Sequence, residues 1–223
     1  MQEGSIKVIN VERNVVARRS LTEETLTLGL HVLCERDPDL AGVVMRFGPP
    51  PMWAREPGFP TLIHIILEQQ VSLASAKAAY QRLLAAASPL TPDRFLDLDD
   101  AALKRIGFSH QKTAYGRELA RAVLSGRLNL AELETRDDVT VRSELIQIKG
   151  IGPWTADIYL LMALRRPDVW PSGDLALANA AQRVKQLASR PTPDELDALG
   201  ATWRPWRAVA ARLLWHYYLS NPV

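Results

Sequence analysis

A short turn between two helical patterns constrains this chain more than any other stretch. It reads Ile148-Lys149-Gly150-Ile151-Gly152-Pro153. The two glycines allow the backbone to turn sharply and to approach a ligand closely, and the proline fits the first turn of the helix that follows. Unpaired backbone amides at such a helix start attract anions. The turn therefore predicts either a backbone anion site or a tight helix–helix connection that binds no ligand.

Helical patterns fill most of the chain. Ser20-Leu21-Thr22-Glu23 resembles a capping box that starts a helix ending near Arg36, and Thr192-Pro193-Asp194-Glu195 resembles a second one. Further helical segments are expected at residues 61–71, 73–87 (bent near Ser72 or continuous with the previous segment), 93–103, 111–124, 139–148 and 205–219. Residues 6–16 suit an extended segment or an arm, and residues 47–60 a loop rich in proline and glycine. The pattern predicts an all-α fold.

Composition sets outer limits on the function. The chain has 223 residues, 47% of them hydrophobic and 23% charged, which is typical of a soluble globular protein. The single cysteine, Cys34, excludes an internal disulfide and any four-thiolate iron–sulfur or zinc site built by this chain alone. A net charge of +2 permits nucleic-acid binding without demanding it. No apolar run suits a membrane helix and no signal peptide is evident, so we expect a cytoplasmic protein.

A second short segment follows the turn along the chain. Trp170-Pro171-Ser172-Gly173-Asp174 is a proline-containing loop, and a helical pattern begins at Leu175. Aspartate is a favoured N-cap, so Asp174 is expected to cap this helix. A helix N-terminus also keeps a carboxylate ionised, and such a group can stabilise positive charge that develops on a sugar. Asp174 can therefore serve as a cap, as a catalytic carboxylate, or as both.

Together, the turn and the loop resemble the helix-hairpin-helix DNA glycosylase superfamily. In that family a Gly-x-Gly hairpin is followed, after a proline-containing loop, by an essential aspartate. The resemblance narrows to the DNA-3-methyladenine glycosylase II branch, the bacterial alkylpurine glycosylases. Three further segments carry it: residues 66–72 (ILEQQVS), residues 103–107 (LKRIG), and residues 203–207 (WRPWR) leading to Trp215. The similarity spans roughly residues 60–220.

This resemblance implies an architecture of two helical lobes flanking a DNA-binding cleft. Residues 1–60 would form an arm and a helix packed on the second lobe. Residues 61–165 would form the central lobe, with the helix-hairpin-helix at 139–164, and residues 166–223 would complete the second lobe. The implied protein is a monomer that acts on damaged double-stranded DNA, in a bacterium at the nucleoid.

The implied activity is that of a monofunctional glycosylase of base excision repair, which releases alkylated purines such as 3-methyladenine and 7-methylguanine by base flipping. Family members that also cut the backbone carry a lysine nucleophile two residues after the second hairpin glycine. Trp154 occupies that position here. The resemblance therefore implies hydrolysis without AP-lyase activity, with Asp174 as the catalytic carboxylate.

Other site residues follow from the same resemblance. The implied base pocket contains Trp154, Trp215 and His216. The implied DNA-binding residues are Gln69, Gln70, Lys149, Gly150, Ile151, Gly152 and Thr155, with Gln70 at the wedge position that fills the gap left by the flipped base. A sodium or potassium ion held by the backbone carbonyls of Ile146, Ile148 and Ile151 is a further expectation, and no other cofactor is implied.

Several alternatives remain open at the level of sequence. Gln69 and Gln70 could simply end a helix at the surface. A basic stretch with one acid, Glu118, could face phosphates or only solvent; it comprises Lys104, Arg105, His110, Lys112, Arg117 and Arg121. The lesion could be an oxidised, deaminated or mismatched base, and the hairpin could belong to a DNA-binding module without catalysis.

Overall fold

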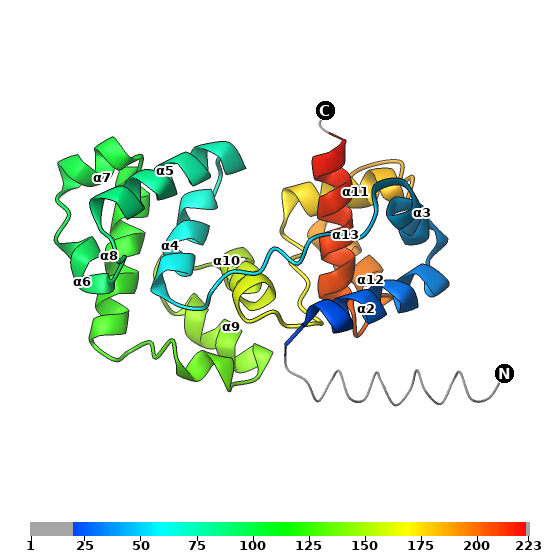
Figure 1. Ribbon diagram of the computed structural model, residues 1–223, viewed down its shortest axis with the longest axis horizontal. Helices are drawn as coiled ribbons and strands as arrows, with labels where there is room; N and C mark the ends of the chain where they lie inside the picture. The colour runs from blue at the N-terminus through cyan, green and yellow to red at the C-terminus, as the bar shows by residue number, and fades with distance from the viewer. Residues whose placement is uncertain (1–19, 222–223) are drawn as a thin grey trace. The chain divides into compact units, whose positions relative to one another are not determined.

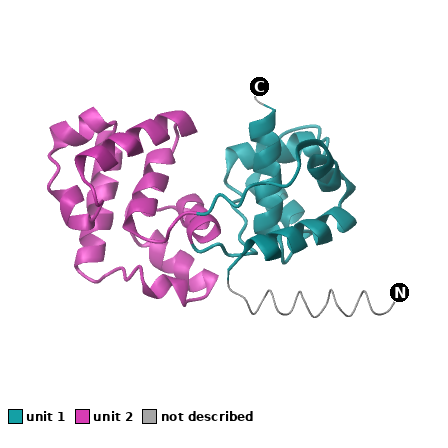
Figure 2. Cartoon of the chain, viewed as in Figure 1, with its two compact units in different colours: residues 1–54, 164–223 teal, residues 55–163 magenta. Residues whose placement is uncertain are grey.

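The computed structural model describes residues 20–221, and the predicted extended segment at 6–16 lies outside them. The chain forms two compact units (Figures 1 and 2). Unit 1 combines residues 1–54 with residues 164–223, and unit 2 consists of residues 55–163. The sequence predicts the boundaries between the two lobes near residues 60 and 165.

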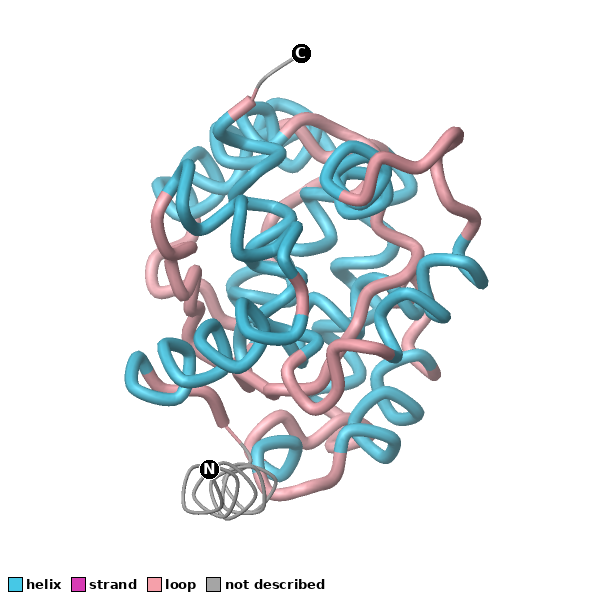
Figure 3. Tube along the Cα trace, turned by 90° about the vertical axis from the view of Figure 1, so that its right-hand side faces the viewer, coloured by secondary structure: helices cyan, strands magenta, loops and turns pink. Residues whose placement is uncertain are grey.

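Throughout residues 20–221 the chain consists of helices and loops, with no strand (Figure 3). The predicted all-α class is therefore confirmed. Within the same residues, no helix combines the length and the apolar character needed to cross a membrane.

Unit 1 is built around its last helix. In α13, every side chain from Ala208 to Trp215 is buried, including the charged Arg212. This helix packs against the two helices that precede residue 54 and against α11, so the two parts of the unit share one core. The helices of unit 1 are α2 (Glu23–Arg36), α3 (Pro38–Phe47), α11 (Leu175–Val184), α12 (Pro193–Ala201) and α13 (Arg207–Ser220).

The first capping box was predicted at the wrong residues. The N-cap of α2 is Thr22, which exchanges hydrogen bonds with Thr25, rather than Ser20 paired with Glu23. The reason lies in Leu21, which is fully buried and whose backbone N–H donates to the carbonyl of Arg165 at 2.6 Å. Tertiary packing of this residue therefore places the helix start two residues later than Ser20.

A further helix, α3, follows α2 directly and was not predicted. Asp37 ends α2 and at the same time caps α3, where its Oδ1 accepts from the N–H groups of Asp39 and Leu40. Pro38 then occupies the first turn of α3. An Asp-Pro pair can stop one helix and start the next, and Asp37-Pro38 does both here.

Unit 2 is organised around α4 (Phe59–Glu68). Its residues Leu62, Ile63, Ile65, Ile66 and Leu67 are at most 2% exposed, and it packs against α5, α8 and α10. The two alternatives near Ser72 are resolved as a break, because α4 ends at Glu68 and Ser72 caps α5. The other elements are α5 (Leu73–Ala86), α6 (Pro92–Leu96), α7 (Asp100–Ile106), α8 (His110–Leu124), a 3-10 turn (Glu132–Glu134), α9 (Asp138–Ile146), α10 (Pro153–Ile158) and a π-helical turn (Tyr159–Ala163).

Candidate functional site

The predicted hairpin lies between α9 and α10 in unit 2. Gly150 has φ +98°, and a Cβ added to it would lie 2.1 Å from Cγ of Tyr115. Gly152 differs, because its φ is −93° and an added Cβ would meet no atom within 4 Å. The fold therefore requires glycine at position 150, for both backbone conformation and space, whereas Gly152 is exposed and its lack of a side chain serves no internal contact.

A partly buried charge pair joins the two hairpin helices. Asp157 on α10 is 7% exposed and accepts hydrogen bonds from Nε, at 2.7 Å, and from Nη2 of Arg142 on α9. In the turn itself Ile148 and Ile151 are buried, whereas Lys149 is exposed. This arrangement gives Asp157 a structural role and leaves Lys149 accessible to a ligand.

The Gln69-Gln70 turn contacts the hairpin directly. Nε2 of Gln69 donates to the carbonyl of Gly150 at 2.9 Å and to Oγ1 of Thr155 at 3.0 Å. Gln70 is exposed and has a left-handed backbone with φ +56°. The structure thus brings together three of the predicted DNA-binding residues, Gln69, Gly150 and Thr155, through contacts that the sequence analysis did not predict. No local sequence signal indicates them, because 81 residues separate Gln69 from Gly150.

In unit 1, Asp174 caps α11 as predicted. Its Oδ1 accepts from the backbone N–H of Leu177 at 2.7 Å and from Nε1 of Trp215 at 3.1 Å. Trp215 is a buried residue of α13, with 8% of its surface exposed. The carboxylate of Asp174 is therefore oriented by its own helix and by α13, and the partially positive hydrogen of the Trp215 indole N–H lies against one carboxylate oxygen.

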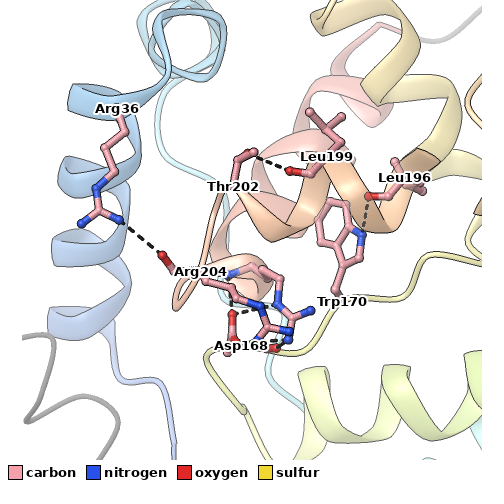
Figure 4. Close-up of polar contacts among 8 residues, drawn as sticks. Arg36, Asp168, Trp170, Leu196, Leu199, Thr202 and Arg204 are labelled. Carbon is pink, nitrogen blue, oxygen red and sulfur yellow. Dashed lines mark hydrogen bonds and ion pairs between the residues drawn. The ribbon is translucent and has the colours of Figure 1, made fainter. Parts of the chain in front are cut away.

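The loop that precedes Asp174 is anchored inside unit 1 (Figure 4). Asp168 accepts from Arg204 at 2.9 Å and from Nε of Arg207 at 2.8 Å. The indole N–H of Trp170 donates to the carbonyl of Leu196 at 3.0 Å, and its ring lies so close to Gly200 that a Cβ there would be 2.5 Å from Nε1. Trp170 is thus a buried anchor of the loop.

His216, a predicted pocket residue, is half-buried on α13. Its Nε2 lies 3.0 Å from the carbonyl of Phe47, and because a carbonyl only accepts, this nitrogen carries the hydrogen. The ring centroid of Trp53 is 6.4 Å from that of His216. Trp215 and His216 therefore lie on consecutive positions of α13 in unit 1, whereas the third predicted pocket residue, Trp154, is half-buried on α10 in unit 2.

The buried Arg212 holds the proline-rich loop on α13. Its Nε donates to the carbonyl of Met52 at 2.8 Å and its Nη1 to the carbonyl of Ala208 at 3.0 Å. Burial lowers the pKa of this guanidinium to about 10, so it remains charged at neutral pH. The charge is solvated by backbone carbonyls in place of water.

The basic stretch of α7 and α8 is partly engaged within unit 2. Arg117 pairs with Asp100 at 2.6 Å, and Nζ of Lys112 donates to the carbonyl of Leu67 at 2.7 Å. Four other basic residues are exposed, namely Lys104, Arg105, His110 and Arg121. Among residues 20–221, no three His, Cys, Asp or Glu side chains are grouped so that they could hold a metal ion.

Comparison with known proteins gives a consistent picture. Residues 63–205 match the family described as HhH-GPD superfamily base excision DNA repair protein. The Bacillus subtilis protein YfjP, which carries a provisional DNA-3-methyladenine glycosylase name, is 32% identical over 162 residues, covering 69% of this chain and 56% of YfjP. The match thus spans little more than half of that relative.

Two further similarities come from fission yeast, Schizosaccharomyces pombe. Its DNA-3-methyladenine glycosylase 1 is 30% identical over 168 residues, covering 74% of this chain and 73% of the yeast protein. The solved structure of 3-methyladenine DNA glycosylase Mag1 in complex with abasic DNA has a TM-score of 0.77 and 28% identity, covering 86% of this chain and 95% of that one.

Proposed function

Because the chain belongs to the HhH-GPD superfamily of base excision DNA repair proteins, we propose that it is a DNA glycosylase that releases alkylated purines. The observation that carries the proposal is Asp174 at the N-terminus of α11, with its carboxylate held by Leu177 and Trp215. The names of the similar proteins support 3-methyladenine as a substrate. We extend the proposed substrate class to related alkylated purines of the 7-methylguanine type. The proposed partner is damaged double-stranded DNA, bound by a monomer.

Asp174 supplies the chemistry in this proposal. Breaking an N-glycosidic bond builds positive charge on the sugar as the base leaves, and a carboxylate near the anomeric carbon stabilises that charge or orients the attacking water. An alkylated, cationic base leaves with little protonation. One carboxylate without a paired general acid is therefore sufficient for this substrate class.

The hairpin supplies DNA binding. Gly152 is exposed and bears no side chain, so the turn can approach a phosphate closely, and the exposed Lys149 adds a positive charge beside it. The wedge position belongs to Gln70, which is exposed next to the hairpin-bound Gln69. Base flipping requires such a group to fill the gap in the duplex.

The residues proposed to contact the flipped base are Trp215 and His216 of unit 1 and, separately, Trp154 of unit 2. A flipped, electron-poor base gains about 1–3 kcal/mol by stacking on an indole ring.

We also propose that the hairpin binds a sodium or potassium ion through the backbone carbonyls of Ile146, Ile148 and Ile151. Ile146 is the last residue of α9, and the carbonyl of Ile148 already accepts from the N–H of Ile151 at 2.9 Å. Helix-terminal carbonyls suit such an ion, because they lack full intrahelical partners. When bound, it would supply positive charge close to a phosphate.

The central test compares the wild type with Asp174→Asn on duplexes that carry methylated purines. Asparagine caps helices as well as aspartate does, so stability and DNA binding should persist while base release falls about 100- to 10,000-fold. Asp99→Asn is the matched control, since Asp99 caps α7 through the N–H of Ala102 at 2.6 Å. Near-wild-type release by Asp174→Asn would show that this carboxylate is not catalytic.

A second measurement tests the proposed lack of AP-lyase activity. With Trp154 in place of the lysine nucleophile, incubation with an abasic duplex and borohydride should trap no covalent complex. A trapped complex would overturn this part of the proposal. A panel of duplexes with oxidised, deaminated and mismatched bases identifies the preferred lesion, and DNA binding without release of any base would indicate a non-catalytic module.

A further inference from the structure

Gln69 is the C-cap of α4 and ties the following turn to the hairpin. Its Nε2 donates to the carbonyl of Gly150 at 2.9 Å and to Oγ1 of Thr155 at 3.0 Å. A carbonyl only accepts, so the contact with Gly150 fixes which end of the amide faces the hairpin. The amide nitrogen has two hydrogens and two acceptors, and Thr155 is 2% exposed. This side chain is therefore committed to an internal contact rather than presented to solvent.

The last two residues of α4, which precede the turn, are held by two other side chains. Nζ of Lys112 donates to the carbonyl of Leu67 at 2.7 Å, and the guanidinium of Arg55 donates to both carboxylate oxygens of Glu68, at 3.0 and 2.7 Å. Beyond Gln69, however, the next residues are exposed, beginning with Gln70. The side chain of Gln69 is thus held by the hairpin immediately before the exposed tip.

Gln70 has an unfavourable backbone conformation, with φ +56°. A residue other than glycine keeps a left-handed conformation only where its surroundings hold it. The Gln69 amide supplies that restraint on one side of Gln70. It also links the position of Gln70 to Gly150, whose carbonyl belongs to the turn that would bind a DNA phosphate.

We propose that Gln69 is a positioning residue, which couples the hairpin to the wedge residue Gln70 so that phosphate binding and insertion into the duplex occur in one fixed geometry. This inference rests on the proposed glycosylase function. In this proposal Gln69 acts by holding Gln70 in place. Removing the Gln69 amide should therefore slow base release only when the Gln70 side chain is present.

The test is a double-mutant cycle of Gln69→Met and Gln70→Ala, because methionine keeps the length of glutamine and removes the amide. Single-turnover base release is measured together with the fluorescence of 2-aminopurine placed opposite the lesion, which reports local unstacking. Gln69→Met should slow release about ten-fold, as expected for one well-placed hydrogen bond, and should reduce the fluorescence increase. In the Gln70→Ala background the same change should have little further effect.

Thr155→Val removes the second acceptor while keeping side-chain shape, and it should reproduce a smaller part of the Gln69→Met effect. Gln81→Met, at an exposed position of α5, is the matched control and should leave both readouts unchanged. Fully additive losses in the cycle, or no loss in either the Gln69 or the Thr155 variant, would overturn the inference. Absence of base release by the wild type would instead refute the proposed function.

Discussion

At the scale of single residues, the carboxylate of Asp174 accepts hydrogen bonds of different origin. The N–H of Leu177 is the ordinary donor to an N-cap, whereas Nε1 of Trp215 comes from α13, 41 residues along the chain. The orientation of Asp174 therefore depends on the packing of α13 as well as on its own loop. An oriented carboxylate stabilises a positively charged transition state more than a mobile one does, because it need not reorient during the reaction.

Trp215→Phe removes this indole donor and keeps an aromatic ring. We expect base release to slow about ten-fold in single-turnover assays, with little change in DNA affinity. Trp203→Phe is the matched control, because Nε1 of Trp203 donates to Oδ2 of Asp37 at 2.8 Å elsewhere in unit 1. It should lower Tm without slowing release. Equal rates for Trp215→Phe and wild type would mean that the hydrogen bond to Asp174 does not contribute to catalysis.

Asp37 makes the stability of unit 1 dependent on pH. Burial acts to raise its pKa, but hydrogen bonds from Trp203 and Lys185 outweigh burial and hold the pKa below its usual value. Because the folded pKa lies below the unfolded one, the stabilisation is complete above the unfolded value of about 3.9 and is lost as the pH falls through the folded value.

Asp37→Asn should therefore destabilise the protein by about 2 kcal/mol at pH 7, as estimated from the loss of a buried charge partner of Lys185. The difference from wild type should shrink as the pH is lowered below about 4, because the unfolded wild type then begins to bind a proton at Asp37 while the folded protein still holds this carboxylate charged. Urea unfolding of both proteins at pH 7 and at pH 3 measures this. A difference that stays constant between these pH values would contradict the assigned role of the Asp37 charge.

The hydrogen-bond partners of the candidate site residues were predictable from sequence only where the two partners are close in the chain. The capping role of Asp174 was predictable, because Leu177 follows within one helical turn. The contacts of Gln69 with Gly150 and of Trp215 with Asp174 were not, because they depend on how separate helices pack. Tertiary contacts of this kind leave no local periodic signal.

At the scale of elements, helix starts with strong local chemistry were predicted correctly. Thr192 and Glu195 form the expected capping box of α12. The error at α2 arose where burial of Leu21 outweighed a local pattern, and α3 was missed because Asp37-Pro38 serves two helices at once. Local signals thus predict a helix start where the capping residues serve one helix, and they fail where tertiary burial or a shared capping residue decides it.

The hairpin allows its two glycines to be separated by experiment. Gly150→Ala should destabilise the protein by about 2–4 kcal/mol, because φ is +98° and the new Cβ would clash with Tyr115. Gly152→Ala should change stability by less than about 0.5 kcal/mol, because its backbone is ordinary and the space around it is open. Thermal unfolding of the two variants checks this difference.

The Gly152→Ala variant, which should be as stable as the wild type, should nevertheless bind DNA more weakly. If the backbone at Gly152 approaches a phosphate, an added Cβ should weaken binding by about ten-fold or more while Tm is unchanged. Affinity for a duplex with an abasic analogue is the measurement. Unaltered affinity for Gly152→Ala would argue that this glycine does not face DNA.

Tyr115→Ala combined with Gly150→Ala should recover only part of the stability that Gly150→Ala loses, because the strain of the Gly150 backbone remains.

At the scale of the whole molecule, the two units differ in how the chain builds them. Unit 2 is continuous, residues 55–163, whereas unit 1 is assembled from the parts of the chain on either side of it. The two ends of unit 2 are joined internally, because the N–H of Arg55 donates to the carbonyl of Met162 at 3.0 Å and that of Gly58 to the hydroxyl of Tyr159 at 3.0 Å. Burial raises the pKa of this hydroxyl to about 12, so it stays protonated at neutral pH.

A continuous unit with joined ends and its own core should fold when expressed alone. We expect a fragment of residues 55–163 to show helical circular dichroism and a cooperative thermal transition. A fragment of residues 164–223 should show neither, because the fully buried Val209 and Leu213 of α13 lie in a core to which α2 and α3 contribute. A non-cooperative 55–163 fragment would mean that its core depends on unit 1. Cooperative folding of both fragments would mean that α2 and α3 are dispensable for α13, which the burial of this helix argues against.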